Sequence, residues 1–282
     1  MKFAIIIPVY NEEAFLKQML QSIVNQTKIP DLVVLVNDNS TDGTQKIIDL
    51  YTSKYPFIKG IMNTSEAKHL PGSKVVNAFY KGFKTLKENF DLIGKFDADI
   101  ILPNNYFEKI IQLFSEDNKV GLAGGNLYIE EKEKWVFETI SEKTKVRGPI
   151  KLYRKECFQS IGGLKKSIGW DTVDGLLAVY HGWKIKADTS LHVKHLKPTG
   201  ASYTKEASQK QGEAFYRMRY GKALTRIASL KLALNKNQFN FYFECMQGYK
   251  NAKKQQTPFI VNQEEGNFIR ELRWKGIKAK IL

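Results

Sequence analysis

The sequence predicts an α/β protein with a mainly parallel central sheet and flanking helices. Apolar, strand-like segments alternate with amphipathic, helix-like segments through the first half, as in right-handed βαβ units. Polar residues follow three of these strands at their carboxyl ends. The chain has 282 residues, of which 43% are hydrophobic, so it can form one large domain or a domain with an extension.

Strand-like and helix-like segments alternate along the first half of the chain. Apolar residues recur at helical spacing after the first strand, and Thr44 suits the cap of the second helix. The expected strands are 3–9, 32–36, 57–62 and 92–96, and the expected helices are 12–26, 44 to at least 51, and 74–88. The repeated order predicts a parallel sheet in this half.

The second half departs from strict alternation and predicts a mixed sheet, suited to a second substrate. A charged loop is expected at 130–135. The other expected elements are helices at 106–114 and 173–181 and strands at 120–129, 148–153 and 183–187. Residues 1–204 are therefore predicted to form one domain with a nucleotide-binding half and a mixed acceptor half.

Residues 205–282 are predicted to form a basic, helical C-terminal extension. They hold 16 Lys/Arg and 6 Asp/Glu, a net charge of +10 out of +15 for the chain. Residues 207–234 have the spacing of one or two amphipathic helices. Basic amphipathic helices with aromatic residues bind anionic membranes, but the same pattern also fits helices packed on the main domain with a solvated basic face. Both interpretations stay open at this point.

Three features of the sequence indicate the cellular compartment of the protein: the length of its apolar runs, its first eight residues and its cysteines. The longest apolar runs fall short of 18 residues, so no transmembrane helix is expected. The segment 1–8 is expected to begin a strand rather than a signal peptide. Cys157 and Cys245 lie far apart without metal-ligand spacing, which favours unpaired thiols in a reducing cytosol. The sequence predicts no oligomeric state.

Asp97 and Asp99 form the most informative pair in the chain. They follow the apolar strand 92–96, and side chains two apart on extended backbone point to one side. Open α/β sheets bind ligands at this strand edge. Two close carboxylates repel unless a cation neutralises them, and Mg²⁺ binds through one or two carboxylates plus substrate phosphates. A solvated Asp-x-Asp turn is the alternative.

Two other strands end in polar residues. Pro8, Tyr10, Asn11 and Glu12 lie at the end of the first strand, where the ring of Tyr10 suits stacking on a base. Asn11 alternatively caps the following helix. Asp38 ends the second strand and suits hydrogen bonds from a base N–H or a ribose hydroxyl, or alternatively the stabilisation of a turn.

Five motifs in order resemble family 2 glycosyltransferases of the GT-A fold. The resemblance covers roughly residues 1–200, and the motifs together are far more specific than any one alone. They are PVYNEE at 8–13, VNDNSTDGT at 36–44, GSKVVNAFYKG at 72–82, FDADI at 96–100, and IGGL followed by GWDTVDGLLAVYHGWK within 161–184. The resemblance implies inverting sugar transfer from a nucleotide-sugar, with UDP favoured, and a divalent metal, Mg²⁺ or Mn²⁺.

The resemblance also implies roles for individual residues. Asp99 would coordinate the metal and Asp97 would meet the ribose, while His195 resembles a third metal ligand or is a packed histidine. The implied nucleotide-binding residues are Pro8, Tyr10, Asn11, Glu12, Asp38, Lys74 or the nearby His69, and Asp97.

Asp171 matches the general base of the family, which deprotonates the acceptor hydroxyl. Trp170 replaces the Glu that usually precedes this Asp, so Asp174 stays an alternative base, and Trp170 itself is expected to line the acceptor site. Asn37 and Tyr80 also depart from the family pattern. None of these three changes removes the implied metal ligand or base.

The leading functional prediction is a cytoplasmic enzyme, peripheral on the inner face of the plasma membrane, that extends a bacterial cell-envelope glycan or a lipid-linked acceptor. The basic extension would bind the anionic lipid surface. The alternatives are a catalytically degenerate nucleotide-sugar-binding protein and a basic nucleic-acid-binding protein. Charge permits the latter, but no nucleic-acid-binding motif is present, and nucleic acid is not an expected partner.

Overall fold

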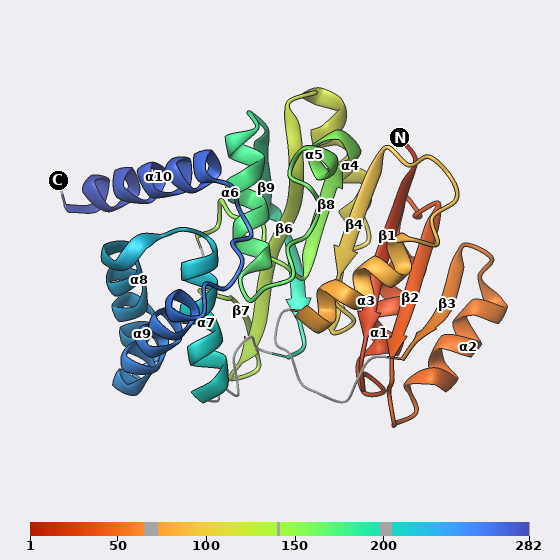
Figure 1. The fold of residues 1–282 in the computed structure, drawn as a ribbon. Coiled ribbons are helices and arrows are strands. Elements are labelled where there is room, and N and C mark those ends of the chain that lie inside the picture. Colours follow the sequence, from red (N-terminus) through yellow and green to blue (C-terminus); the bar gives the residue numbers. More distant parts are fainter. Residues whose placement is uncertain (65–72, 140–141, 198–204, 282) are drawn as a thin grey trace. The chain divides into compact units, whose positions relative to one another are not determined.

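The computed structural model describes residues 1–64, 73–139, 142–197 and 205–281 (Figure 1). The chain divides into two compact units. The first, the sheet unit, comprises Met1–Leu70, Lys74–Leu164 and His181–Thr199. The second, the helical unit, comprises Pro71–Ser73, Lys165–Tyr180 and Gly200–Leu282. The sequence prediction had assigned residues up to 204 to one domain, whereas these contacts group Lys165–Tyr180 with the C-terminal helices.

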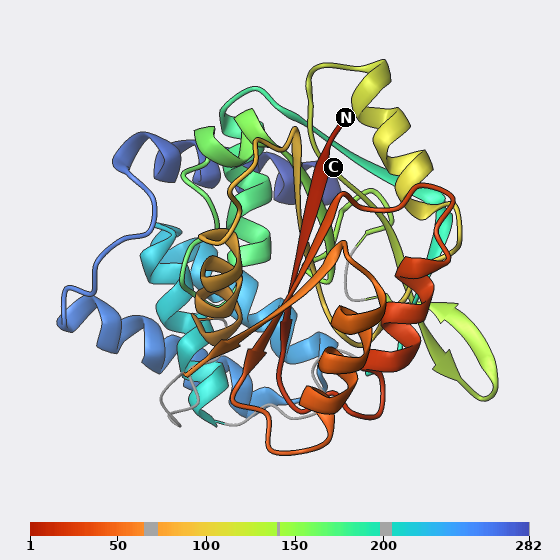
Figure 2. The same ribbon diagram turned by 90° about the vertical axis from the view of Figure 1, so that its right-hand side faces the viewer.

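Within the described residues, nine strands form the sheet of the sheet unit, in the order β3-β2-β1-β4-β8-β6-β9-β5, with β7 paired to β6 (Figures 1 and 2). The first four in this order are parallel, and β8, β5 and β7 run antiparallel to their neighbours. The strands are β1 Phe3–Val9, β2 Leu32–Asp38, β3 Ile58–Asn63, β4 Leu92–Phe96, β5 Ile100–Ile101, β6 Val120–Glu131, β7 Lys134–Phe137, β8 Ile150–Arg154 and β9 Lys184–His195.

Helices cover both faces of this sheet. On one face, α1 Leu16–Val24, α2 Thr44–Lys54 and α4 Tyr106–Glu116 bury their apolar stripes against β1, β2 and β4, which forms the main core. The other face carries α3 Ser73–Phe83 and α5 Lys155–Ser160. The α/β architecture, parallel in its first half and mixed in its second, is confirmed.

Gly82 explains how closely α3 packs on the sheet. A Cβ atom at this position would lie 2.7 Å from Ile6 and 2.8 Å from Val36, which is closer than real Cβ contacts. The absent side chain therefore lets the helix backbone approach the strands.

The predicted loop at 130–135 is wrong, because these residues belong to a β-hairpin. Strands β6 and β7 pair from Tyr128↔Phe137 to Glu131↔Lys134. Lys132 and Glu133 connect them with φ of 49° and 64°, as in a two-residue hairpin turn with both central residues left-handed. The charged residues that suggested a loop lie in this exposed turn and on the strand ends beside it, where water solvates them.

The helical unit contains α6 Trp170–Tyr180, α7 Lys205–Arg217, α8 Gly221–Asn235, α9 Phe239–Lys254 and α10 Gln263–Ile281. The predicted helical segment 207–234 is two helices, separated at Arg219 and Gly221, which have positive φ. None of the described helices is long and apolar enough to cross a membrane. Cys157 and Cys245 are buried and neither is part of a disulfide, in agreement with the prediction of two thiols.

Helices α7 and α9 approach each other at two glycines. A Cβ atom on Gly212 would lie 1.8 Å from the carbonyl oxygen of Cys245, and one on Gly248 would lie 1.9 Å from that of Gln209. Each glycine therefore faces the backbone of the partner helix. Only residues without a side chain allow this separation.

Candidate active site

Parallel pairing brings the ends of β1, β2 and β4 to one edge of the sheet. Tyr10 follows β1 and has 55% of its surface exposed. Asp38, at the end of β2, is buried and accepts a hydrogen bond of 2.7 Å from the Nδ2 group of Asn63 on β3. The edge thus has an exposed aromatic ring and a fixed carboxylate.

The loop after β1 is tied to the loop after β2. The Oδ1 atom of Asn11 accepts a hydrogen bond of 2.8 Å from the Thr41 amide, and its own amide donates to Ser40 Oγ at 3.0 Å. Asn11 has φ of 52°, a conformation that Asn tolerates better than most residues. The alternative role as a helix cap is wrong, because α1 begins only at Leu16. Pro8 lies within β1, half-buried.

Lys74 lies close to Tyr10 in the sheet unit. Its Nζ atom is 5.7 Å from the centre of the Tyr10 ring. The first turn of α3 therefore places a cation beside the exposed ring, although the two residues are 64 positions apart in the chain. His69 lies outside the described residues.

Asp97 pairs with a lysine that precedes it on β4. The Nζ atom of Lys95 contacts Asp97 Oδ1, and the Lys95 side chain is only 3% exposed. The Asp97 amide donates to the carbonyl of Pro149 at 3.0 Å. The Asp97 carboxylate is therefore held in place by a buried cation, a contact that sequence spacing did not reveal.

Asp99 is buried at the same edge, with 8% of its surface exposed. Burial, and then the nearby charges of Asp97 and Glu12, raise the pKa of Asp99, while His195 and Lys197 oppose the rise, and the net pKa is about 6. The Oδ2 atom of Asp99 is 3.7 Å from Nε2 of His195.

Strand pairing explains why Asp99 meets His195. Ile100 of β5 pairs with His195 at the end of β9, and the Leu196 amide donates to the Asp99 carbonyl at 2.8 Å. The predicted metal ligands, nearly one hundred residues apart, thus lie together.

Glu138 contacts the His195 ring at Nδ1, the nitrogen that does not face Asp99. Its Oε2 atom lies 3.2 Å from Nδ1 of His195, and it also pairs with Arg147. Burial lowers the pKa of His195, but Glu138 and Asp99 raise it, and the net direction is upward. Sequence reasoning missed Glu138 and Arg147. The apolar segment before Glu138 was the available signal, because it reads as a strand ending at a carboxylate.

Glu12 adds a further carboxylate to this edge. Its Oε1 and Oε2 atoms accept hydrogen bonds from Lys197 Nζ at 2.7 and 2.6 Å. Burial raises the pKa of Glu12, and Asp97 adds to the rise, while Lys197 opposes it. Glu12, Asp97 and Asp99 therefore form an acidic group that lysines and a histidine only partly neutralise.

Asp99 and His195 fit a divalent cation that also binds ligands from elsewhere. An ionised Glu138 only accepts hydrogen bonds, so it favours the proton on Nδ1 and leaves the Nε2 lone pair facing Asp99. Two acceptors facing each other at this distance are satisfied by a proton or a metal ion. No three His, Cys, Asp or Glu side chains group as a metal site within the described part of the chain, so water molecules or phosphate oxygens would complete the shell of a cation bound here.

The predicted base and acceptor residues lie on α6 in the helical unit. Asp174 is fully buried, and its Oδ1 atom accepts a hydrogen bond from the Gly175 amide. Asp171, in the first turn of the helix, is partly exposed, and Trp170 is 7% exposed. Of the two aspartates, only Asp171 has side-chain surface for an incoming hydroxyl.

Known proteins of similar sequence include a described glycosyltransferase and a protein of teichoic acid biosynthesis. A protein of Mycoplasma pneumoniae described as an uncharacterized glycosyltransferase, MG025 homolog, is 29% identical over 59% of this chain and 57% of its own length. The minor teichoic acid biosynthesis protein GgaA of Bacillus subtilis is 27% identical over 43% of this chain and 26% of its own. The chain therefore spans little more than half of the first relative and about a quarter of the second.

Solved structures share the fold at low sequence identity. S. aureus TarS 1-349 in complex with UDP-GlcNAc has a TM-score of 0.57 and 16% identity, covering 95% of this chain and 78% of that one. Mannosyltransferase PcManGT from Pyrobaculum calidifontis, in complex with GDP-Man and Mn²⁺, has a TM-score of 0.58 and 14% identity, covering 100% and 81%.

The family model described as glycosyl transferase family 2 matches residues 4–165, from the second residue of β1 to just past α5. The match includes the whole strand edge that carries Tyr10, Asp38, Asp97 and Asp99, and it extends over more than half of the chain. The chain belongs to glycosyl transferase family 2.

Proposed function

We propose that this protein is an inverting glycosyltransferase that moves a sugar from a nucleotide-sugar, with UDP favoured, to a hydroxyl group of a glycan or lipid-linked acceptor. The observation that carries the proposal is the juxtaposition of buried Asp99 and His195 at the strand edge that also presents Tyr10. Family membership and fold neighbours solved with UDP-GlcNAc and GDP-Man support a nucleotide-sugar donor.

The nucleoside would lie over the ends of β1 and β2. The exposed ring of Tyr10 suits stacking on the base, and Asp38 would accept a hydrogen bond from a base N–H or a ribose hydroxyl. Asp97 would accept from the ribose, held in place by Lys95. Lys74 beside Tyr10 would place positive charge near the donor.

Asp99 and His195 would hold a divalent cation, Mg²⁺ or Mn²⁺. A bound cation supplies neutralisation of the charge that develops on the leaving diphosphate. The chain's part is to present one carboxylate and one imidazole, with Glu138 fixing the ring. A fold neighbour solved with Mn²⁺ supports the use of a divalent cation.

Asp171 would act as the general base. A sugar hydroxyl is a weak nucleophile, so a carboxylate within hydrogen-bond reach must take its proton as the new glycosidic bond forms. The exposure of Asp171 and the complete burial of Asp174 favour Asp171. Trp170 beside it would contribute to the acceptor site.

A cell-envelope acceptor at the inner face of the plasma membrane fits the remaining observations. The relative named for teichoic acid biosynthesis supports an envelope polymer. The net charge of +10 in residues 205–282 favours an anionic membrane surface, where lipid-linked acceptors are found.

Calorimetric titration of UDP, GDP and TDP, with and without Mn²⁺, tests the donor site on the wild type and on Asp99→Asn. We expect one nucleotide to bind in a metal-dependent way and Asp99→Asn to lose that dependence. Asp49→Asn, a change at an exposed position on α2, serves as the control. Failure of every nucleotide to bind would contradict the proposal, and salt-sensitive binding of duplex DNA would favour the nucleic-acid alternative.

A further inference from the structure

We propose that α8 and α9 present a lipid-inserting face that docks the protein on an anionic bilayer. Five large apolar side chains on these two helices are exposed. They are Ile227 at 40%, Leu230 at 47%, Leu234 at 58%, Phe239 at 66% and Phe243 at 68%. Residues of this kind are usually buried in the core of a folded domain, and a cluster of exposed ones indicates a binding surface.

The exposed residues follow helical spacing and so form a stripe on each helix. Ile227, Leu230 and Leu234 are three and four positions apart on α8, and Phe239 and Phe243 are four apart on α9. The core of the helical unit uses a different set on α8, which includes Leu224, Thr225, Ser229 and Ala233. The exposed stripes are therefore additional to the residues that the fold buries.

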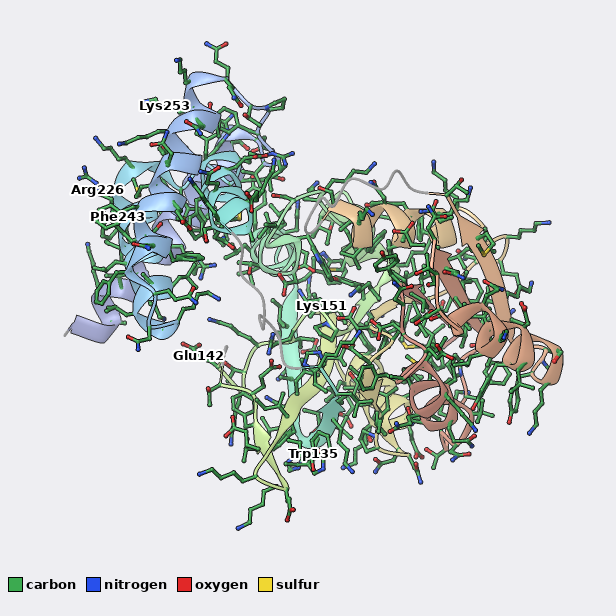
Figure 3. All side chains as sticks on the ribbon, turned by 90° about the horizontal axis from the view of Figure 1, so that it is seen from below. Trp135, Glu142, Lys151, Arg226, Phe243 and Lys253 are labelled. Carbon is green, nitrogen blue, oxygen red and sulfur yellow. The ribbon has the colours of Figure 1, made fainter. Side chains whose placement is uncertain are left out.

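Basic residues accompany the apolar stripes. Between residues 221 and 254 the chain has seven Lys/Arg and a single acidic residue, Glu244. Arg226 and Phe243 project from the same edge of the helical unit in Figure 3. The basic residues of this segment are Lys222, Arg226, Lys231, Lys236, Lys250, Lys253 and Lys254.

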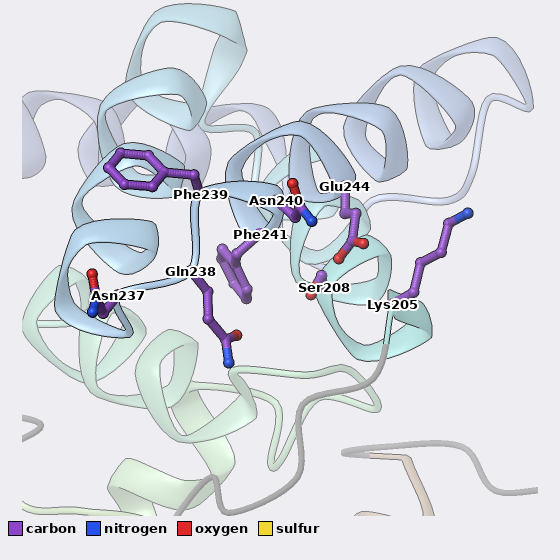
Figure 4. Close-up of a pocket in the computed structure, with 8 residues that line it drawn as sticks. All are labelled: Lys205, Ser208, Asn237, Gln238, Phe239, Asn240, Phe241 and Glu244. Atoms are coloured by element: carbon purple, nitrogen blue, oxygen red, sulfur yellow. The ribbon is translucent and has the colours of Figure 1, made fainter.

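A polar pocket of about 460 Å³ opens at the turn between the two helices, beside Phe239 (Figure 4). Lys205, Ser208, Asn237 and Asn240 contribute hydrogen-bond donors to its lining, and Glu244 contributes an acceptor. In a helix bound at the bilayer surface, polar groups of this kind contact the lipid headgroups, while an aromatic ring beside them enters the boundary with the acyl chains.

The positive charge of α8 and α9 favours an anionic bilayer, rather than a second copy of this chain, as the partner of this face. A symmetric interface through α8 and α9 would bring this basic segment of one copy against the same basic segment of the other, with only Glu244 to compensate. Anionic headgroups attract these residues, while the acyl region accepts the Leu and Phe side chains. The inference rests on the membrane-side acceptor proposed above, for which it names the docking surface.

Sedimentation of the full-length protein with phosphatidylcholine vesicles, and with equimolar phosphatidylcholine and phosphatidylglycerol, tests the surface. Leu234→Asp is compared with Leu50→Asp, because Leu50 on α2 has nearly the same exposure, 57% against 58%. We expect binding to the anionic vesicles only, weakened at least about tenfold by Leu234→Asp and unchanged by Leu50→Asp. Phe243→Ser should weaken binding by a similar factor.

Other outcomes overturn the inference. Equal binding of wild type, Leu234→Asp and Phe243→Ser would show that apolar insertion plays no part. Loss of self-association in Leu234→Asp, without vesicle binding by the wild type, would assign the face to a second copy. The nucleotide titration on the same samples separates the failure of this surface from the failure of the donor site, because donor binding needs no vesicles.

Discussion

The Nδ1 atom of His195 lies 3.2 Å from the Oε2 atom of Glu138, and both side chains are buried. Glu138 is fixed in turn by Arg147. A carboxylate that accepts a hydrogen bond from the ring N–H of a metal-binding histidine, on the nitrogen that does not bind the metal, orients the ring and sets its tautomer. Glu138 therefore acts on the proposed metal site through His195, as a positioning residue.

Removal of the Glu138 carboxylate should weaken metal binding. We expect Glu138→Ala to lower Mn²⁺ affinity, measured by electron paramagnetic resonance in the presence of UDP, by about ten- to a hundredfold. Glu138→Gln should have a smaller effect, because its amide oxygen still accepts the Nδ1 proton. Glu131→Gln, on the exposed end of the same hairpin, is the control. Equal Mn²⁺ affinity in all four proteins would refute the positioning role.

Substitution of the proposed metal ligand Asp99 and of the proposed base Asp171 should separate donor binding from transfer. Asp171→Asn should leave nucleotide affinity intact and reduce the transfer rate by about a hundred- to ten-thousandfold, since the amide cannot accept the proton. Asp99→Asn should instead weaken metal-dependent nucleotide binding. Calorimetry and single-turnover kinetics measure the two effects. Wild-type transfer by Asp171→Asn would move the base assignment to Asp174.

Local sequence patterns predicted which polar residues meet at one edge of the sheet. The apolar strand before Asp97, and the polar residues after the first two strands, are signals within a few positions, and parallel pairing then brings their ends together. Glu138 was missed for a different reason. It approaches His195 only because β6 pairs with both β7 and β9, a long-range arrangement that no local spacing encodes.

The Tyr10 ring should contribute to nucleotide binding by stacking. Tyr10→Ala should reduce affinity for the preferred nucleotide by about 5- to 150-fold, because stacking of a base on an aromatic side chain is worth about 1–3 kcal/mol. Tyr10→Phe keeps the ring and should bind nearly as well as the wild type. If both variants bind equally weakly in calorimetric titration, the hydroxyl group and not the ring is responsible.

The stability of the helical unit should depend on the two glycines at which α7 and α9 approach each other. A methyl group at Gly212 would lie 1.8 Å from the Cys245 carbonyl oxygen, so the helix backbones must separate to accept it. We expect Gly212→Ala to lower the free energy of unfolding by about 1–3 kcal/mol, because backbone cannot rotate aside as a side chain does. Urea unfolding followed by circular dichroism measures the change.

Gly276 on α10 provides the matched control for Gly212. A Cβ atom there meets nothing within 4 Å, so Gly276→Ala should raise the free energy of unfolding by about 0.5–1 kcal/mol through helix propensity alone. Gly248→Ala should behave like Gly212→Ala, because its Cβ atom would meet the Gln209 carbonyl oxygen. A stabilising effect at all three positions would mean that α7 and α9 are not held at this separation, since propensity would then outweigh packing everywhere.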